Sequence, residues 1–183
     1  MSTVPIAAAS LTFALAATFA AAQSPPVAPT QSVAPPPKPK PCTAPEHRQF
    51  DFWIGDWQVR DPAGKPVGEN RIVALHGGCV LLESWSGAGG FTGSSVNGYD
   101  ADRQQWHQTW MDSSGGVLQI DGRFADGRMT LAGDAPGEKP GDTIRNRITW
   151  TPLPDGRVRQ LWESSNDGGK TWTTAFDGLY SRK

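Results

Sequence analysis

Beyond residue 50 the chain is divided into short segments by turn-forming residues. Clusters of glycine with aspartate, asparagine, serine or proline recur about every 8–14 residues, which is typical of antiparallel β structure. Such residues supply the positive φ angles of tight turns, and no segment after residue 52 shows a helical period. The spacing predicts an all-β fold with strands at 57–60, 67–75, 79–85, 94–100, 104–111, 117–124, 128–133, 143–151, 157–165 and 171–181.

Strands joined by short sequential turns can hide their edges by closing into a barrel. We therefore predict an up-and-down antiparallel barrel of about ten strands. A two-sheet sandwich is the alternative, but the tight successive hairpins favour the barrel. Residues 44–54 fit a short helical turn before the first strand.

Residues 1–22 are predicted to be a signal peptide. Residues 4–22 carry no charge and are rich in alanine, and Ala20, Ala21 and Ala22 form a small-residue cleavage site. An uncleaved membrane anchor is the alternative, but alanine is weakly hydrophobic and the run is short for a bilayer crossing. We expect a periplasmic or secreted protein that meets the membrane only through this segment, during export.

Residues 23–45 hold more than half of the chain's 16 prolines. Proline removes backbone donors, and this stretch has no apolar period, so it is predicted to be a semi-extended tether. The folded domain is accordingly predicted to span residues 46–183.

The chain has two cysteines, Cys42 at the end of the tether and Cys79 inside the domain. In a reducing cytosol they would be buried thiols, whereas behind an export signal an even pair more often forms a disulfide. We predict a Cys42–Cys79 bond, which would stabilise the domain by roughly 3–4 kcal/mol on the chain-entropy model.

Charge gives no indication of a polyanionic partner. The formal net charge is −1, and the charges are spread without blocks. A nucleic-acid-binding protein would carry a basic stripe or patch. We therefore predict no nucleic-acid partner, and the sequence favours no particular oligomeric state.

Residues 50–57 read F-D-F-W-I-G-D-W, and Gly55 and Trp57 fit the G-x-W motif of calycins, in which a helical turn closes the barrel floor. The chain resembles an uncharacterised family of secreted bacterial proteins with a lipocalin-like (calycin-type) domain of unknown function. That family's other motifs are G-G-C-x-x-x-E, S-x-N-x-Y-D, W-x-Q-x-W and F-x-G-x-Y, here at 77–83, 95–100, 106–110 and 176–180. The resemblance implies a barrel with Trp57 at its floor, but no activity.

A more distant resemblance links the chain to nitrobindin-type haem barrels, which also open with G-x-W. The glycine pattern that follows the tryptophan in those proteins is absent here, and no histidine follows His107 to serve as a proximal haem ligand. We therefore predict no cofactor.

Period-two alternation separates the inner and outer faces of the strands. Arg145, Arg147, Arg157 and Arg159 favour water, so their alternate neighbours should face the barrel interior. The predicted inner set combines amides with aromatic rings: Asn97, Tyr99, Trp106, Gln108, Trp110, Asn146, Gln160 and Trp162.

This inner set is polar for a protein core. A buried amide without partners costs roughly 1–3 kcal/mol, so these amides either bond one another in a filled barrel or face a cavity. Aromatic walls with a few polar anchors are typical of ligand sites. We predict that the eight residues line one cavity, which binds a neutral, partly polar small molecule. The alternation leaves the facing of Glu83 and Trp85 ambiguous.

Motifs for metal binding or catalysis are weak. His47, His76 and His107 lack close ligand spacing, so we predict no metal, and no nucleophile-elbow motif frames a serine. Residues 165–172 fit the S-x-D-x-G-x-T-W Asp-box of sialidases, but the motif occurs once and predicts a hairpin turn.

Three functions remain open. The first is an exported small-molecule-binding barrel. The second is an enzyme, an isomerase or a hydrolase, that uses the same cavity with Glu83 as acid or base. The third is an envelope interaction protein with a filled barrel. A cavity would argue against the third function, and a carboxylate buried in the cavity wall would favour the second.

Overall fold

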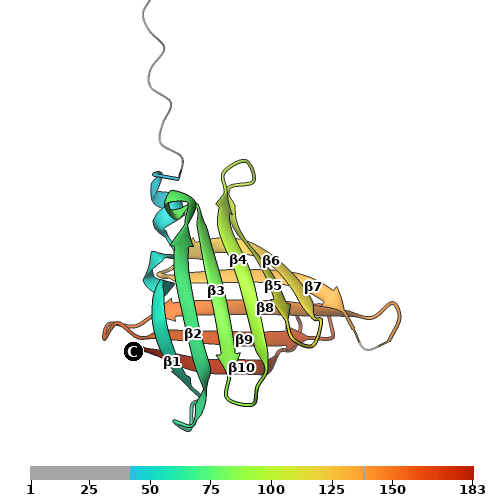
Figure 1. The fold of residues 1–183 in the computed structure, drawn as a ribbon. Coiled ribbons are helices and arrows are strands. Elements are labelled where there is room, and N and C mark those ends of the chain that lie inside the picture. Colours follow the sequence, from blue (N-terminus) through green and yellow to red (C-terminus); the bar gives the residue numbers. More distant parts are fainter. Residues whose placement is uncertain (1–41, 138) are drawn as a thin grey trace, which may run out of the picture. The chain divides into compact units, whose positions relative to one another are not determined.

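The computed structural model describes residues 42–137 and 139–183; the predicted signal peptide and most of the predicted tether lie outside them. The described part is a closed, all-antiparallel barrel of ten strands, which confirms the predicted fold class (Figure 1). Its strands are β1 (Gly55–Arg60), β2 (Pro66–Leu75), β3 (Val80–Gly87), β4 (Thr92–Asp100), β5 (Gln105–Asp112), β6 (Val117–Ala125), β7 (Arg128–Pro136), β8 (Thr143–Pro152), β9 (Val158–Ser165) and β10 (Thr173–Arg182).

Each strand pairs with its sequence neighbours, and β10 returns to pair with β1. Turn chemistry explains the strand boundaries: between β6 and β7, Asp126 and Gly127 both have positive φ, at 51° and 73°, as a two-residue hairpin turn of type I′ requires. At the closing seam Trp57 lies opposite Arg182 and Val59 opposite Tyr180. The Arg182 guanidinium lies 4.4 Å from the Trp57 ring and donates to the Ile54 carbonyl oxygen at 3.0 Å.

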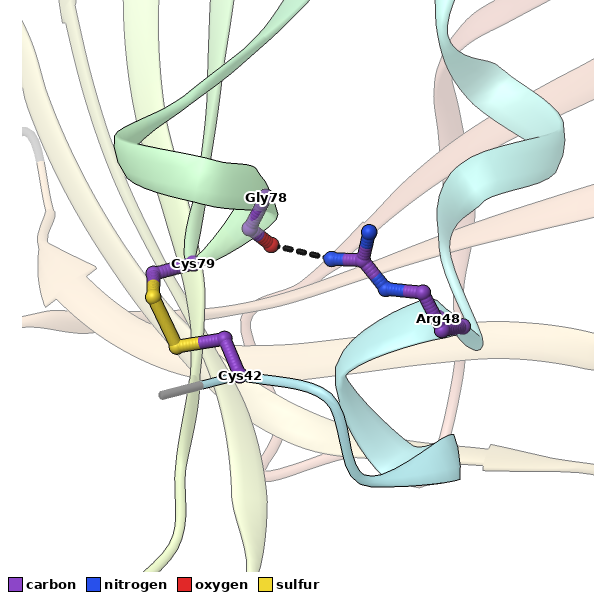
Figure 2. Close-up of a disulfide and its surroundings, with 4 residues drawn as sticks. All are labelled: Cys42, Arg48, Gly78 and Cys79. Carbon is purple, nitrogen blue, oxygen red and sulfur yellow. Dashed lines mark hydrogen bonds between the residues drawn. A yellow bond between two sulfur atoms is a disulfide. The ribbon is translucent and has the colours of Figure 1, made fainter. Parts of the chain in front are cut away.

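The segment before β1 forms two 3-10 turns, η1 (Pro45–Arg48) and η2 (Asp51–Trp53). A disulfide joins Cys42 to Cys79 across a Cα–Cα distance of 5.1 Å, which confirms the predicted pairing. Figure 2 shows that the Arg48 guanidinium also donates to the carbonyl oxygen of Gly78, whose φ of +90° favours glycine. The residues before β1 are thus fastened to the turn between β2 and β3. No helix within the described ranges is both long and apolar enough to cross a bilayer.

The turns η1 and η2 close one end of the barrel with aromatic side chains, which we call the aromatic floor. Its members are at most 2% exposed: Phe50, Trp53, Trp57, Trp106 and Trp150. The Phe50 ring stacks on Trp53 at 4.8 Å and meets Trp106 and Trp150 edge-on at 5.5 and 5.1 Å. The Trp57 indole donates to the Trp53 carbonyl oxygen at 2.9 Å. Trp57 therefore packs as a floor residue, as the G-x-W resemblance implied.

The single Asp-box motif forms the connection between β9 and β10. Asp167 accepts hydrogen bonds from the backbone amides of Lys170 and Thr171 and from the Ser165 and Thr171 hydroxyls. These bonds, led by those from Thr171, hold the pKa of the Asp167 carboxyl below its ordinary value. The Trp172 indole donates to the Gly169 carbonyl oxygen at 3.0 Å, so the motif acts as a structural turn.

Candidate ligand-binding cavity

The end of the barrel opposite the aromatic floor is hollow. A cavity of about 370 Å³ opens there between the β3–β4 loop and the first residues of β10, a size typical of small-molecule sites. Its lining is formed by Val67, Glu83, Trp85, Gly87, Ala88, Gly89, Phe91, Gln108, Trp110, Leu118, Ile148, Gln160, Trp162, Ala175, Phe176 and Tyr180.

Aromatic rings from four strands form the cavity walls: Trp85, Trp110, Trp162 and Phe176. Trp85 meets Phe176 edge-on at 5.8 Å. The indole nitrogens of Trp110 and Trp162 donate to Asp112 Oδ2 at 3.0 Å and to Asn146 Oδ1 at 2.9 Å. Because protein acceptors occupy both N–H groups, these two walls offer a ligand ring surface rather than hydrogen-bond donors.

Small residues leave the mouth of the cavity open. These residues are Gly87 at the end of β3, Ala88 and Gly89 in the β3–β4 loop, and Ala175 on β10. The loop is fixed by hydrogen bonds from the Gly87 amide to the Phe91 carbonyl oxygen and from the Ala88 amide to the Val67 carbonyl oxygen, at 2.8 and 2.9 Å. Phe91 is 44% exposed, so an apolar ring lies at the entrance.

A continuous chain of hydrogen-bonded side chains crosses the barrel at the base of the cavity; we call it the polar belt. It consists of Asn70, Glu83, Ser95, Asn97, Gln108, Gln160 and Tyr180, from six strands. In one arm Gln108 donates to Asn97 at 2.6 Å, Asn97 to Ser95 at 2.8 Å, and Ser95 to Glu83 at 2.5 Å. In the other arm Asn70 donates to Glu83 at 2.7 Å and to Tyr180 at 3.3 Å, and Tyr180 donates to Gln160 at 2.5 Å.

Glu83 is the centre of the belt and is 4% exposed. Burial raises the pKa of its carboxyl from 4.5 to about 7, and the hydrogen bonds from Ser95 and Asn70 only partly oppose this rise. Burial and the neighbouring Glu83 charge raise the pKa of the Tyr180 phenol well above 10, so Tyr180 stays protonated. Among the described residues that line the cavity there is no lysine, arginine, histidine or aspartate. When Glu83 ionises, the cavity therefore becomes negatively charged, and no positively charged side chain of the lining compensates this charge.

Four of the eight sequence-predicted site residues line this cavity: Gln108, Trp110, Gln160 and Trp162. Gln108 is buried at its base, and the other three are half-buried. The arginines used to orient the strands lie outside as expected, since Arg147 pairs with Glu163 at 2.9 Å and Arg159 with Asp177 at 2.7 Å.

The other four predicted residues lie off the cavity wall. Asn97 is buried within the polar belt and Asn146 holds the Trp162 indole. Trp106 belongs to the aromatic floor, and Tyr99 lies beside it, 6.2 Å from Trp106 and edge-on to His47 at 5.2 Å. Alternation identifies which face of a strand a side chain occupies, but not its height along the barrel axis. These four side chains lie at the aromatic floor, within the polar belt or behind the Trp162 indole, and not on the cavity surface.

Sequence reasoning did not assign three residues that define the site, Asn70, Phe176 and Tyr180, and it left open whether Glu83 faces the cavity. Glu69 and Arg71 are charged and flank Asn70 on β2, so alternation could have placed Asn70 inside. No such signal exists for Glu83, because Leu81 and Leu82 lie on opposite faces of its strand. Only its position in the barrel shows that it faces inward.

No known family model matches the chain, and no curated protein matches it at a significant level. The resemblance to secreted lipocalin-like proteins therefore stays a prediction that rests on the motifs quoted above.

Proposed function

We propose that this protein is an exported β-barrel that binds a neutral, partly polar small molecule in the cavity above the polar belt. The observation that carries the proposal is the combination of an open cavity of about 370 Å³, four aromatic walls and amide and carboxyl groups at its base. Ligand sites usually unite apolar walls with a few polar anchors. The proposed contacts are Glu83, Gln108, Trp110, Gln160 and Trp162.

Two further features support this proposal. The hollow end disfavours a filled-barrel interaction protein, because side chains do not occupy the barrel throughout. The disulfide fits an oxidising compartment, and together with the alanine-rich leader it supports a periplasmic or secreted location. Membership of the lipocalin-like family that the motifs resemble is part of the same proposal.

Native mass spectrometry of protein purified from its own host tests the function. We expect an added mass on the wild-type protein that is lost in Trp162→Ala, because that change removes a cavity wall. The matched control is Met111→Ala on the outer face of β5, where Met111 is 57% exposed, and it should retain the mass. If no added mass accompanies the wild-type protein, or if both variants retain it, ligand binding in this cavity is contradicted.

Glu83 favours a second candidate, an enzyme that transfers protons within the cavity. A general acid or base works best when its pKa lies near the working pH, and burial raises the pKa of the Glu83 carboxyl to about 7. Incubating the recovered ligand with protein in heavy water tests this function. Deuterium incorporation by the wild type and not by Glu83→Gln would support proton transfer, and equal incorporation with both proteins would refute it.

A further inference from the structure

The Glu83 carboxylate fixes the directions of the hydrogen bonds in the polar belt. An ionised carboxylate can only accept hydrogen bonds, so Glu83 fixes the orientation of both its partners. Asn70 must direct its NH₂ group at Glu83, and the same nitrogen donates to the Tyr180 oxygen. Tyr180 must then direct its own proton at Gln160 Oε1. The ionised Glu83 thereby fixes the orientation of the Gln160 amide on β9.

Gln160 ends this arm at the cavity surface. Because its carbonyl oxygen accepts the Tyr180 proton, its Nε2 group is free to donate, and within residues 42–137 and 139–183 no acceptor bonds to that nitrogen. Gln160 lines the cavity. A ligand in the cavity therefore meets an amide donor whose orientation the belt has fixed.

Glu83 offers the complementary group. Its two oxygens each accept one hydrogen bond, from Asn70 and Ser95, whereas a carboxylate has about four acceptor sites. Glu83 also lines the cavity. The base of the cavity thus presents an acceptor on β3 and a donor on β9, beneath two walls, Trp110 and Trp162, that offer only ring surface.

We propose that the ligand of this cavity is a planar aromatic amide of the lactam type, whose N–H bonds to Glu83 and whose carbonyl oxygen bonds to Gln160. The flat ring would lie against Trp110 and Trp162. This inference rests on the proposed binding function and specifies its chemistry. It disfavours carboxylate ligands such as fatty acids, because Glu83 would repel an anion that no lysine or arginine of the lining neutralises.

Quinolin-2(1H)-one, its N-methyl derivative and decanoate are suitable probes. The first carries both the donor and the carbonyl, the second lacks only the donor, and the third is an anion. Isothermal titration of the oxidised protein at about pH 8 should give an affinity for quinolin-2(1H)-one on the order of tenfold higher than for the N-methyl derivative, the difference of roughly one charge-assisted hydrogen bond. Decanoate should bind more weakly than either.

The same titration at about pH 5.5 measures how protonation of Glu83 changes the affinity. Of the groups that face its carboxyl, Asn70 and Ser95 do not titrate, and Tyr180 stays protonated at both pH values. Protonation should therefore weaken quinolin-2(1H)-one binding on the order of tenfold, while binding of the N-methyl probe stays nearly constant.

Variants at the two groups have different expected signatures. Glu83→Gln should remove the pH dependence and reduce the preference for the N–H probe. Gln160→Met should weaken both quinolinones equally, because both carry the carbonyl. The matched control Glu163→Gln removes an outward carboxylate from β9 and should change neither affinity. Since each of the first two variants gives its own result, failure of one to fold leaves the other as a test.

Two outcomes overturn the inference, and they differ. If the N-methyl probe or decanoate binds as tightly as quinolin-2(1H)-one, and Trp162→Ala abolishes that binding, the cavity binds ligands but the donor–acceptor assignment is wrong. If no probe binds at millimolar concentration, the assignment fails together with the proposed function.

Discussion

The two ends of the barrel follow the same strand alternation but differ in how their interiors are filled. At the closed end large rings meet at 4.8–5.5 Å, and the floor residues are at most 2% exposed. At the open end rings of similar size are only half-buried around a cavity. The segment before β1 inserts Phe50, which precedes η2, and Trp53 of η2 into one end. The opposite mouth instead carries small residues such as Gly87 and Ala175.

The polar belt separates these two environments. On one side of it lies the aromatic floor, and on the other side lies the cavity. The belt also gives the hollow half a defined base, because hydrogen bonds between its side chains hold them in place at the bottom of the cavity. A barrel can thus be stable and hollow when one half supplies the packing and the other half encloses a cavity.

The largest expected effect lies in the floor. Trp57→Ala should lower the free energy of unfolding by about 3–5 kcal/mol, because it deletes a fully buried ring. Urea denaturation of the oxidised protein measures the change. Met111→Ala on the exposed outer face should stay within about 0.5 kcal/mol of wild type. A Trp57→Ala protein as stable as wild type would show that the closed end does not carry the packing.

Loss of the disulfide should also destabilise the protein through the closed end. The double variant Cys42→Ser with Cys79→Ser opens a loop with a sequence separation of 37 residues and should cost roughly 3–4 kcal/mol. Affinity for a cavity probe, measured well below the unfolding transition, should stay nearly unchanged. A parallel fall in affinity would mean that the two ends are coupled rather than separate.

Stability should depend on pH through Glu83, at the boundary between the halves. The folded state holds the Glu83 proton up to about pH 7, whereas the ordinary pKa is 4.5, so the folded state binds more protons between these values. Its contribution to the free energy of unfolding should therefore fall by about 3 kcal/mol as pH rises from about 4.5 to about 7 and stay constant above that. The difference between wild type and Glu83→Gln across this range isolates the effect, and Glu163→Gln should follow the wild type. A wild-type profile that matches that of Glu83→Gln would contradict the raised pKa.

The smallest expected change in stability lies in the cavity wall. Phe176→Ala should cost about 1–2 kcal/mol, because the ring is only half-buried. Probe affinity should nevertheless fall on the order of tenfold, since a wall that faces Trp85 is lost. Paired unfolding and binding titrations measure both quantities. A cost as large as that of Trp57→Ala would erase the distinction between wall and floor.

Local chemistry made the fold predictable from the sequence. The strands differ from their expected bounds by at most three residues, with the largest difference at the end of β7 (Arg128–Pro136). The turns at 126–127 and 166–169 carry residues whose backbone preferences end a strand wherever it lies. The disulfide was predicted from the number of cysteines and the predicted export signal, without any knowledge of geometry.

The candidate site was only partly predictable, because its depth is a property of the closed barrel. Alternation placed Trp106, Gln108 and Trp110 on one face, yet the first packs in the floor, the second joins the belt and the third forms a wall. Which residue lies at which height depends on strand stagger and on the inserted turn before β1. Glu83 was ambiguous because apolar side chains occupy both faces of its strand.

The pairing of β1 with β10 also determines when the barrel can close during synthesis and folding. Trp57 on β1 pairs with Arg182 on β10, so the barrel cannot close until β10 has been synthesised. Contacts between residues so far apart in sequence form slowly. The same pairing makes a chain that lacks β10 an open sheet with two exposed edges, which is prone to aggregation.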